Sequence, residues 1–191
     1  PYPSSYHPRM PDTPWTTIPQ LVDSAAAQFD DTEALVDGDL RLTYSDLAER
    51  IHEASRALMA RGIGPGDRVA IWAPNIWEWV VAALGVHCAG AVLVPVNTRF
   101  KGREAAYVLD RAQVRLLFTV SGFLDTVYVK MLAEAGGGQT IEEIVVLRSS
   151  PSAGSPSGGP PGETGASPPG PVSFAEFLAG HWGRETPDGR V

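Results

Sequence analysis

The pattern of apolar and polar positions changes period along the N-terminal part of the chain. Apolar residues recur at helical spacing over residues 18–29 and 44–58, whereas residues 33–43 read as two short strands. The polar run Asp37-Gly-Asp separates these strands and is typical of a hairpin turn. Thr43 and Asp46 have the spacing of a capping box, and Gly62 suits the end of the second helix. This part therefore predicts a helix, a β-hairpin and a second helix.

From residue 69 onward, short apolar runs alternate with segments of helical pattern. The runs lack the polar alternation of a half-exposed strand, which indicates strands covered on both faces; they lie at residues 69–72, 91–96, 114–120 and 144–147. Helices are predicted between them, at residues 75–88, 103–111 and 123–135. Asn75 and Glu78 form a second capping-box pattern at the start of the first of these. The alternation predicts an α/β fold, with βαβ units, a mostly parallel sheet and helices on both faces.

Composition divides the chain further. Between Ser149 and Pro171, 19 of 23 residues are Gly, Pro or Ser, which predicts a flexible loop. Residues 173–178 then predict a short capped helix. We therefore expect a disordered segment at 1–14, an α/β lobe at 15–148, the flexible loop at 149–171, and a short helix at 172–191 that leads to a missing remainder of the domain.

Charge and cysteine content exclude several classes of protein. The net charge is −7 and Lys and Arg are scattered, which argues against nucleic-acid binding. Cys88 is the single cysteine and lies in an apolar run, as a small buried residue would. The uncharged stretch 79–96 approaches the length of a membrane span, but Gly90 and Pro95 favour a buried helix followed by a strand. A cytoplasmic protein without a transmembrane segment is expected.

Five short segments occur in a fixed order and spacing. They are LTYSDL at 42–47, GIGPGDRVAI at 62–71, PNIWE at 74–78, AGAVLVPVN at 89–97 and EAAYVLD at 104–110. No single segment is specific, but the series closely resembles the opening third of the adenylate-forming (AMP-dependent) synthetases. The sequence of residues 72–100 looks most like that of bacterial acyl-CoA synthetases. The resemblance covers roughly residues 18–147.

The resemblance implies the N-terminal lobe of a carboxylic acid–CoA ligase involved in fatty acid metabolism. Such enzymes form an acyl-adenylate from an acid and ATP, with Mg²⁺, and then pass the acyl group to CoA. The family's phosphate loop, roughly TSGTTGxPKG, is missing from this chain. The glycine-rich residues 157–166 contain no lysine and two adjacent prolines, so they make a poor substitute. We expect a truncated chain that is inactive alone and binds no cofactor by itself, and we assign no catalytic or metal-ligating residue.

The best candidates for a ligand contact follow the strand at 91–96. Asn97, Thr98, Arg99 and Lys101 would lie at the carboxyl edge of the sheet, where ligands of open α/β folds bind. The resemblance implies that Arg99 and Lys101 contact phosphates of CoA. The alternative is a solvated loop with surface charges.

Other interpretations stay open. Trp72, Trp77 and Trp79 fit core packing, although Trp77 or Trp79 could face a second copy, as in a homodimer, or line an acid channel. The chain could belong to an adenylation domain that loads a carrier protein, or be a non-catalytic α/β module that binds CoA or acyl chains. A dinucleotide-binding oxidoreductase is disfavoured, because no Gly-x-Gly-x-x-Gly follows the first strands.

Overall fold

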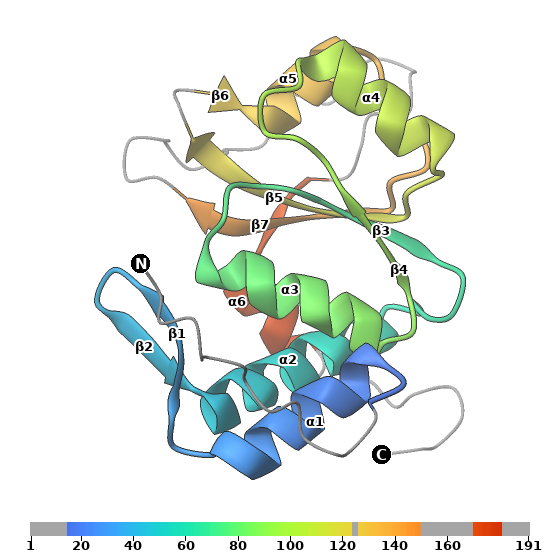
Figure 1. The fold of residues 1–191 in the computed structure, drawn as a ribbon. Coiled ribbons are helices and arrows are strands. Elements are labelled where there is room, and N and C mark those ends of the chain that lie inside the picture. The colour runs from blue at the N-terminus through green and yellow to red at the C-terminus, as the bar shows by residue number, and fades with distance from the viewer. Residues whose placement is uncertain (1–14, 124–125, 150–169, 181–191) are drawn as a thin grey trace, which may run out of the picture.

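A computed structural model describes residues 15–123, 126–149 and 170–180. Figure 1 shows a central twisted sheet with helices above and below it, and a separate hairpin beside the lower helices. The predicted disordered segment 1–14 and most of the predicted loop 149–171 lie outside the described residues. The division into those segments therefore stays a prediction.

The sheet is parallel along its main path. Its strands are β3 (Arg68–Trp72), β4 (Val92–Pro95), β5 (Leu116–Phe123), β7 (Glu143–Ser149) and β8 (Val172–Ser173), in the order β4-β3-β5-β7-β8. All four pairings on this path are parallel, and only the short β6 (Thr126–Val127) pairs antiparallel, with β5. After β3 the chain adds β4 on one side of it, and then crosses back to add β5 on the other side. Right-handed crossovers in these two opposite directions place their helices on opposite faces of the sheet. The α/β class and the mostly parallel sheet are confirmed.

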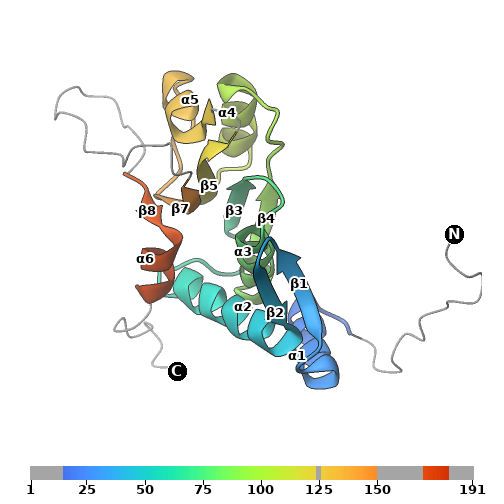
Figure 2. The ribbon, with the colours of Figure 1, turned by 90° about the vertical axis from the view of Figure 1, so that its left-hand side faces the viewer.

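Helices cover both faces of the sheet. The upper layer in Figures 1 and 2 consists of α4 (Gly102–Arg111) and α5 (Tyr128–Glu134). The opposite layer consists of α2 (Tyr44–Met59), α3 (Trp77–Cys88) and α6 (Phe174–Ala179). The backbones of α2 and α3 approach closely, because a Cβ at Gly85 would lie only 2.8 Å from the Cβ of Ala54.

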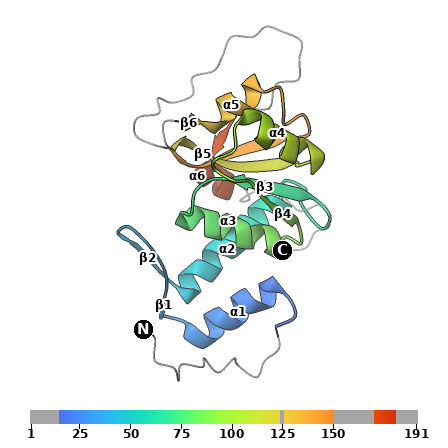
Figure 3. The same cartoon turned by 45° about the horizontal axis from the view of Figure 1, so that its top comes forward.

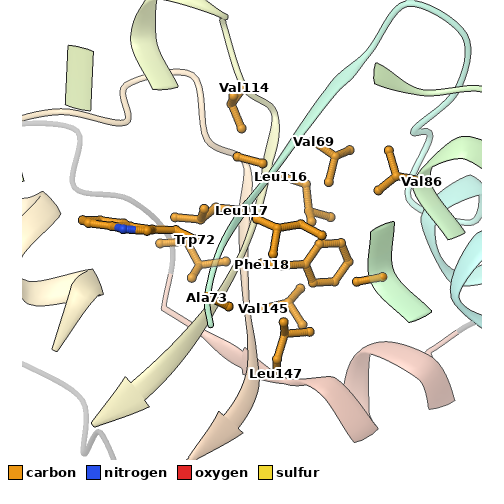
Figure 4. Close-up of a cluster of buried hydrophobic side chains, with 14 of the residues drawn as sticks. Val69, Trp72, Ala73, Val86, Val114, Leu116, Leu117, Phe118, Val145 and Leu147 are labelled. Atoms are coloured by element: carbon orange, nitrogen blue, oxygen red, sulfur yellow. The ribbon is translucent and has the colours of Figure 1, made fainter. Parts of the chain in front are cut away.

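The core lies between the sheet and these layers, as Figure 4 shows for its central part. β3 is buried over its last four residues, and β5 is buried along its first five. Phe118 on β5 packs edge-on against Phe177 of α6, with ring centroids 5.2 Å apart. Burial of one such side chain contributes about 1.5–3 kcal/mol. The long apolar runs of the sequence are therefore explained by strands enclosed on both faces.

The N-terminal elements form as predicted and lie beside the lower helices. They are α1 (Ile18–Phe29) and a hairpin of β1 (Glu33–Asp37) and β2 (Leu40–Thr43). Thr43 and Asp46 form the predicted capping box of α2. Figure 3 shows the hairpin projecting away from the main sheet. Since a lone two-stranded sheet is marginally stable, this hairpin depends on contacts with the rest of the lobe.

Two predictions about helix starts are wrong. The capping box at Asn75 and Glu78 does not form, because α3 begins at Trp77 and the hairpin supplies its cap: the Asp37 carboxylate accepts a hydrogen bond from the Trp77 N–H at 3.2 Å. Glu78 pairs instead with Arg148. The helix predicted at 123–135 begins only at Tyr128. β5 continues to Phe123, where β6 turns back against it.

Candidate functional site: a basic loop at the carboxyl edge of the sheet

The loop between β4 and α4, residues 96–101, lies at the carboxyl edge of the sheet. It starts as a continuation of the sheet, because the Val96 N–H donates to the Ile71 carbonyl at 2.9 Å. Val96 is buried, whereas Asn97, Arg99 and Lys101 are exposed. The loop therefore leaves a buried strand end and presents its polar side chains to solvent, as the sequence predicts for this edge.

Two buried aromatic side chains fix the backbone of this loop. The Trp72 indole N–H donates to the Asn97 carbonyl at 3.1 Å, and the Tyr128 hydroxyl donates to the Thr98 carbonyl at 3.2 Å. Their ring centroids lie 4.5 Å apart, and both residues are at most 1% exposed. Burial raises the pKa of Tyr128 above its usual value, so the phenol stays neutral and able to donate. The loop is thus anchored from β3 and from α5 at once.

Hydrogen bonds within the loop also order its backbone. The Asn97 side-chain oxygen accepts from the Arg99 N–H at 2.9 Å, and the Asn97 carbonyl accepts from the Phe100 N–H at 3.0 Å. These bonds engage the amides of the loop but leave the Arg99 and Lys101 side chains free of any ion pair to a described residue. Two cations thus extend from a fixed backbone.

Helix α4 begins directly after this loop and is held close to α5. The Glu104 carboxylate accepts from the Lys101 N–H at 2.8 Å, which caps the first turn. A Cβ at Gly102 would overlap the Met131 carbonyl oxygen, so only glycine allows this approach. The Glu104 carboxylate already occupies the positive end of the helix dipole, so the positive charge of the loop comes from the two side-chain cations. Cations of this kind form charge-assisted hydrogen bonds with phosphates and carboxylates.

A second constellation lies where the hairpin meets α3. The Arg148 guanidinium on β7 contacts both Glu78 and Asp37 at 2.7 Å, and the Glu78 side chain is only 7% exposed. The hydrogen bond from Arg148 and that from the Trp77 N–H lower the pKa of Asp37 below its usual value. These bonds connect the main sheet to the hairpin. This geometry supports a structural role rather than a catalytic one, since both carboxylates are already paired with Arg148.

A groove of about 430 Å³ lies beside this cluster, between β1 and the start of α3. Trp77 and Trp79 are half-buried and line it, together with Val36 and Ile76. Trp72, in contrast, is fully buried in the core. Core packing is therefore confirmed for Trp72, whereas Trp77 and Trp79 keep one side at the groove.

Other candidate chemistry is limited in the described part of the chain. Residues 15–123, 126–149 and 170–180 contain no group of three His, Cys, Asp or Glu side chains placed to hold a metal ion. Burial raises the pKa of the Cys88 thiol, in keeping with a packing residue. Among the same residues, no helix combines the length and the apolar character needed to cross a membrane.

The fold and this loop define a class of protein: an open, mostly parallel α/β sheet with a basic loop at its carboxyl edge. The family model described as "AMP-binding enzyme" matches residues 22–173. This match covers most of the chain, so the chain belongs to the AMP-binding enzyme family. The resemblance inferred from the five sequence segments is confirmed.

Relatives within the family include CoA ligases and adenylation domains. The chain is 45% identical over 111 residues to 3-[(3aS,4S,7aS)-7a-methyl-1,5-dioxo-octahydro-1H-inden-4-yl]propanoyl:CoA ligase of Rhodococcus jostii (strain RHA1), a match that covers 58% of this chain and 22% of that protein. The chain thus spans about a fifth of the length of this curated relative.

Solved structures give the same picture. The anthranilate CoA ligase AuaEII in complex with anthranoyl-AMP superposes with a TM-score of 0.68 at 22% identity, over 88% of this chain and 29% of that one, which shows the fold. An artificially fused adenylation–PCP di-domain, NpsA-ThdA from Klebsiella oxytoca, matches with a TM-score of 0.53 at 30% identity, over 58% of this chain and 21% of that one.

Proposed function

We propose that this chain is the N-terminal lobe of an ATP-dependent carboxylic acid–CoA ligase, and that Arg99 and Lys101 bind phosphates of CoA. Family membership supports the reaction class, and the anchored loop 96–101 supports the CoA contact. The observation that carries the assignment is that Arg99 and Lys101 make no ion pair with any described residue and extend from a backbone fixed from two elements. A cytoplasmic location would supply the ATP and CoA that such an enzyme consumes.

The reaction has two balanced steps. The carboxylate oxygen attacks the α-phosphorus of ATP and the bond to the β-phosphate bridging oxygen breaks, which gives acyl-AMP and pyrophosphate. The CoA sulfur then attacks the acyl carbon, AMP leaves with the bonding electron pair, and the thiol proton goes to solvent. Mg²⁺ neutralises phosphate charge in the first step when it is bound.

The residues of this chain act on the second step. Arg99 and Lys101 neutralise the phosphate charge of the incoming CoA, because cations on a pre-ordered loop form charge-assisted hydrogen bonds at little ordering cost. Trp72 and Tyr128 keep the loop in place and so position these cations. The chain alone contains no phosphate loop for ATP, so we propose that it is inactive without the remainder of the ligase.

A half-reaction assay on the protein from the complete coding sequence tests this proposal. The Arg99→Ala/Lys101→Ala variant is compared with parent in acid-dependent ATP–pyrophosphate exchange and in thioester formation. We expect exchange to be unchanged and KM for CoA to rise by about 10–30-fold, as loss of two solvent-exposed charge contacts predicts. Arg56→Ala, a change of an exposed arginine on α2, is the control. Equal loss of both half-reactions, or an unchanged KM for CoA, would contradict the assignment.

A further inference from the structure

An apolar surface lies where the hairpin meets the start of α3. Val36 of β1 and Trp77 and Trp79 of α3 line the groove of about 430 Å³ at this place. Both tryptophans are half-buried and Val36 is 48% exposed, so all three keep apolar surface in contact with solvent. Tryptophan is enriched among the residues that dominate protein interfaces. We call Val36, Trp77, Trp79 and the adjoining edge of β1 the hairpin patch.

Strand β1 borders this patch with an unpaired edge. On one side β1 is bonded to β2, and the two strands form a sheet of their own. On the other side, no backbone group of Glu33–Asp37 is bonded to the backbone of a described residue. Figure 3 shows the hairpin apart from the main sheet. An unpaired strand edge beside an apolar surface is a template for pairing with another strand.

The charges of β1 favour contact between two copies of the chain. Glu33 forms an ion pair with Arg41, and Asp37 forms one with Arg148. The strand therefore carries no unpaired carboxylate, although the chain as a whole has a net charge of −7. Two β1 strands can approach each other without the repulsion between bare carboxylates that a strongly acidic surface would cause.

Two unpaired charges of opposite sign belong to the same region. Asp39 lies exposed in the turn between β1 and β2, and the Arg50 guanidinium of α2 lies 5.2 Å from the ring centroid of Trp77. Neither residue forms an ion pair with a described residue. Asp46, one turn before Arg50, is bonded instead to Thr43 at the helix cap. One surface thus offers both members of an ion pair.

We infer that the hairpin patch is the surface through which two copies of this chain associate about a two-fold axis. Each copy contributes the same surface to such an interface, so that surface must be complementary to itself. The hairpin patch meets this requirement in its shape, its backbone and its charge. Val36 of each copy enters the groove of the other, β1 pairs antiparallel with its copy, and Asp39 pairs with Arg50 across the interface.

This association also stabilises the hairpins themselves. A lone two-stranded sheet is marginally stable, whereas pairing along β1 joins two such sheets into one of four antiparallel strands. The inference uses none of the residues assigned to CoA binding. Its success or failure is therefore separate from that of the proposed function.

Sedimentation velocity of the protein from the complete coding sequence, without ATP or CoA, tests the inference. We expect a monomer–dimer equilibrium that Val36→Lys weakens at least about 10-fold, because the change places an unpaired charge at the pairing edge. Val92→Lys is the matched control. Val92 is a similarly exposed valine, at 49%, on the edge strand β4, and its replacement should leave dimerisation unchanged.

Charge reversal tests for an ion pair between copies. Asp39→Arg and Arg50→Asp should each weaken dimerisation at least about 10-fold, since like charges then meet at both symmetry-related contacts. An equimolar mixture of the two variants should recover the parent affinity, because every such contact between the two different chains again joins opposite charges. An ion pair within one chain would not respond to mixing.

Three results would overturn the inference. These are a protein that sediments as a monomer at every concentration, equal weakening by Val36→Lys and Val92→Lys, and no recovery when the two charge-reversal variants are mixed. Circular dichroism melting of each variant separates a loss of association from a loss of folding.

Discussion

Removal of the Tyr128 hydroxyl isolates one of the two bonds that anchor the basic loop. Tyr128→Phe keeps the ring that packs on Trp72 and deletes only the hydrogen bond to the Thr98 carbonyl. A single neutral hydrogen bond contributes about 0.5–1.5 kcal/mol. Thr98 is half-buried, so water can reach its carbonyl once the hydroxyl is gone. We therefore expect the free energy of unfolding to fall by about 1 kcal/mol.

The same change should appear locally in the loop. A loss of about 1 kcal/mol corresponds to a roughly fivefold larger open population. Amide hydrogen exchange at Arg99 and Phe100, whose N–H groups are bonded to Asn97, should quicken by that factor. Tyr107→Phe, on a tyrosine that is 69% exposed, provides the matched control and should change neither quantity. If Tyr128→Phe lowers global stability but leaves exchange at Arg99 and Phe100 unchanged, the anchoring role is refuted.

Further predictions concern the junction of the hairpin and the start of α4. Arg148→Met leaves the buried Glu78 carboxylate without its partner and should destabilise the fold by about 2–3 kcal/mol in urea unfolding, less than for a fully buried pair because Arg148 is partly exposed. A double-mutant cycle with Glu78→Gln should give at least about 1 kcal/mol of coupling, and additivity would contradict a direct pair. Since Asp37 has a lowered pKa when folded, its stabilising effect is present above its usual pKa of 3.8 and is lost as pH falls through the folded value. Asp37→Asn should thus be less stable than parent at pH 7, with a gap that closes below 3.8 in acid titration; a gap that persists there would reject the assignment. Gly102→Ala should lower the free energy of unfolding by about 1–3 kcal/mol, because the new Cβ overlaps a neighbouring carbonyl oxygen. Gly64→Ala, which has open space around it, is the control and should change the free energy of unfolding by less than about 0.5 kcal/mol.

The sequence predicted much of the fold because its signals are local. Strands enclosed on both faces are long apolar runs, and the Thr43 capping box needs only residues three positions apart. The start of α3 could not be predicted in the same way. Its cap comes from Asp37, which lies 40 residues earlier in the chain. A pattern confined to residues 75–78 carries no information about a partner at that distance.

The candidate site shows the same division. Arg99 and Lys101 could be placed at the carboxyl edge, because strand order and the position of β4 decide that location. The anchors were missed. Trp72 was expected only to fill the core, and nothing in the sequence around Tyr128 indicates that its hydroxyl reaches the Thr98 carbonyl, 30 residues away. Side-chain bonds to a distant backbone have no periodicity that a sequence could reveal.

The bond between Arg148 and Asp37 also has a consequence for biosynthesis. It joins positions 111 residues apart, so the hairpin is made long before the guanidinium that fastens it to the main sheet. At a translation rate of about 5–20 residues per second, the hairpin waits roughly 5–20 s for this partner. During that interval the hairpin lacks the ion pair that fastens it to the main sheet, so it stays attached only through the contacts that the earlier elements supply.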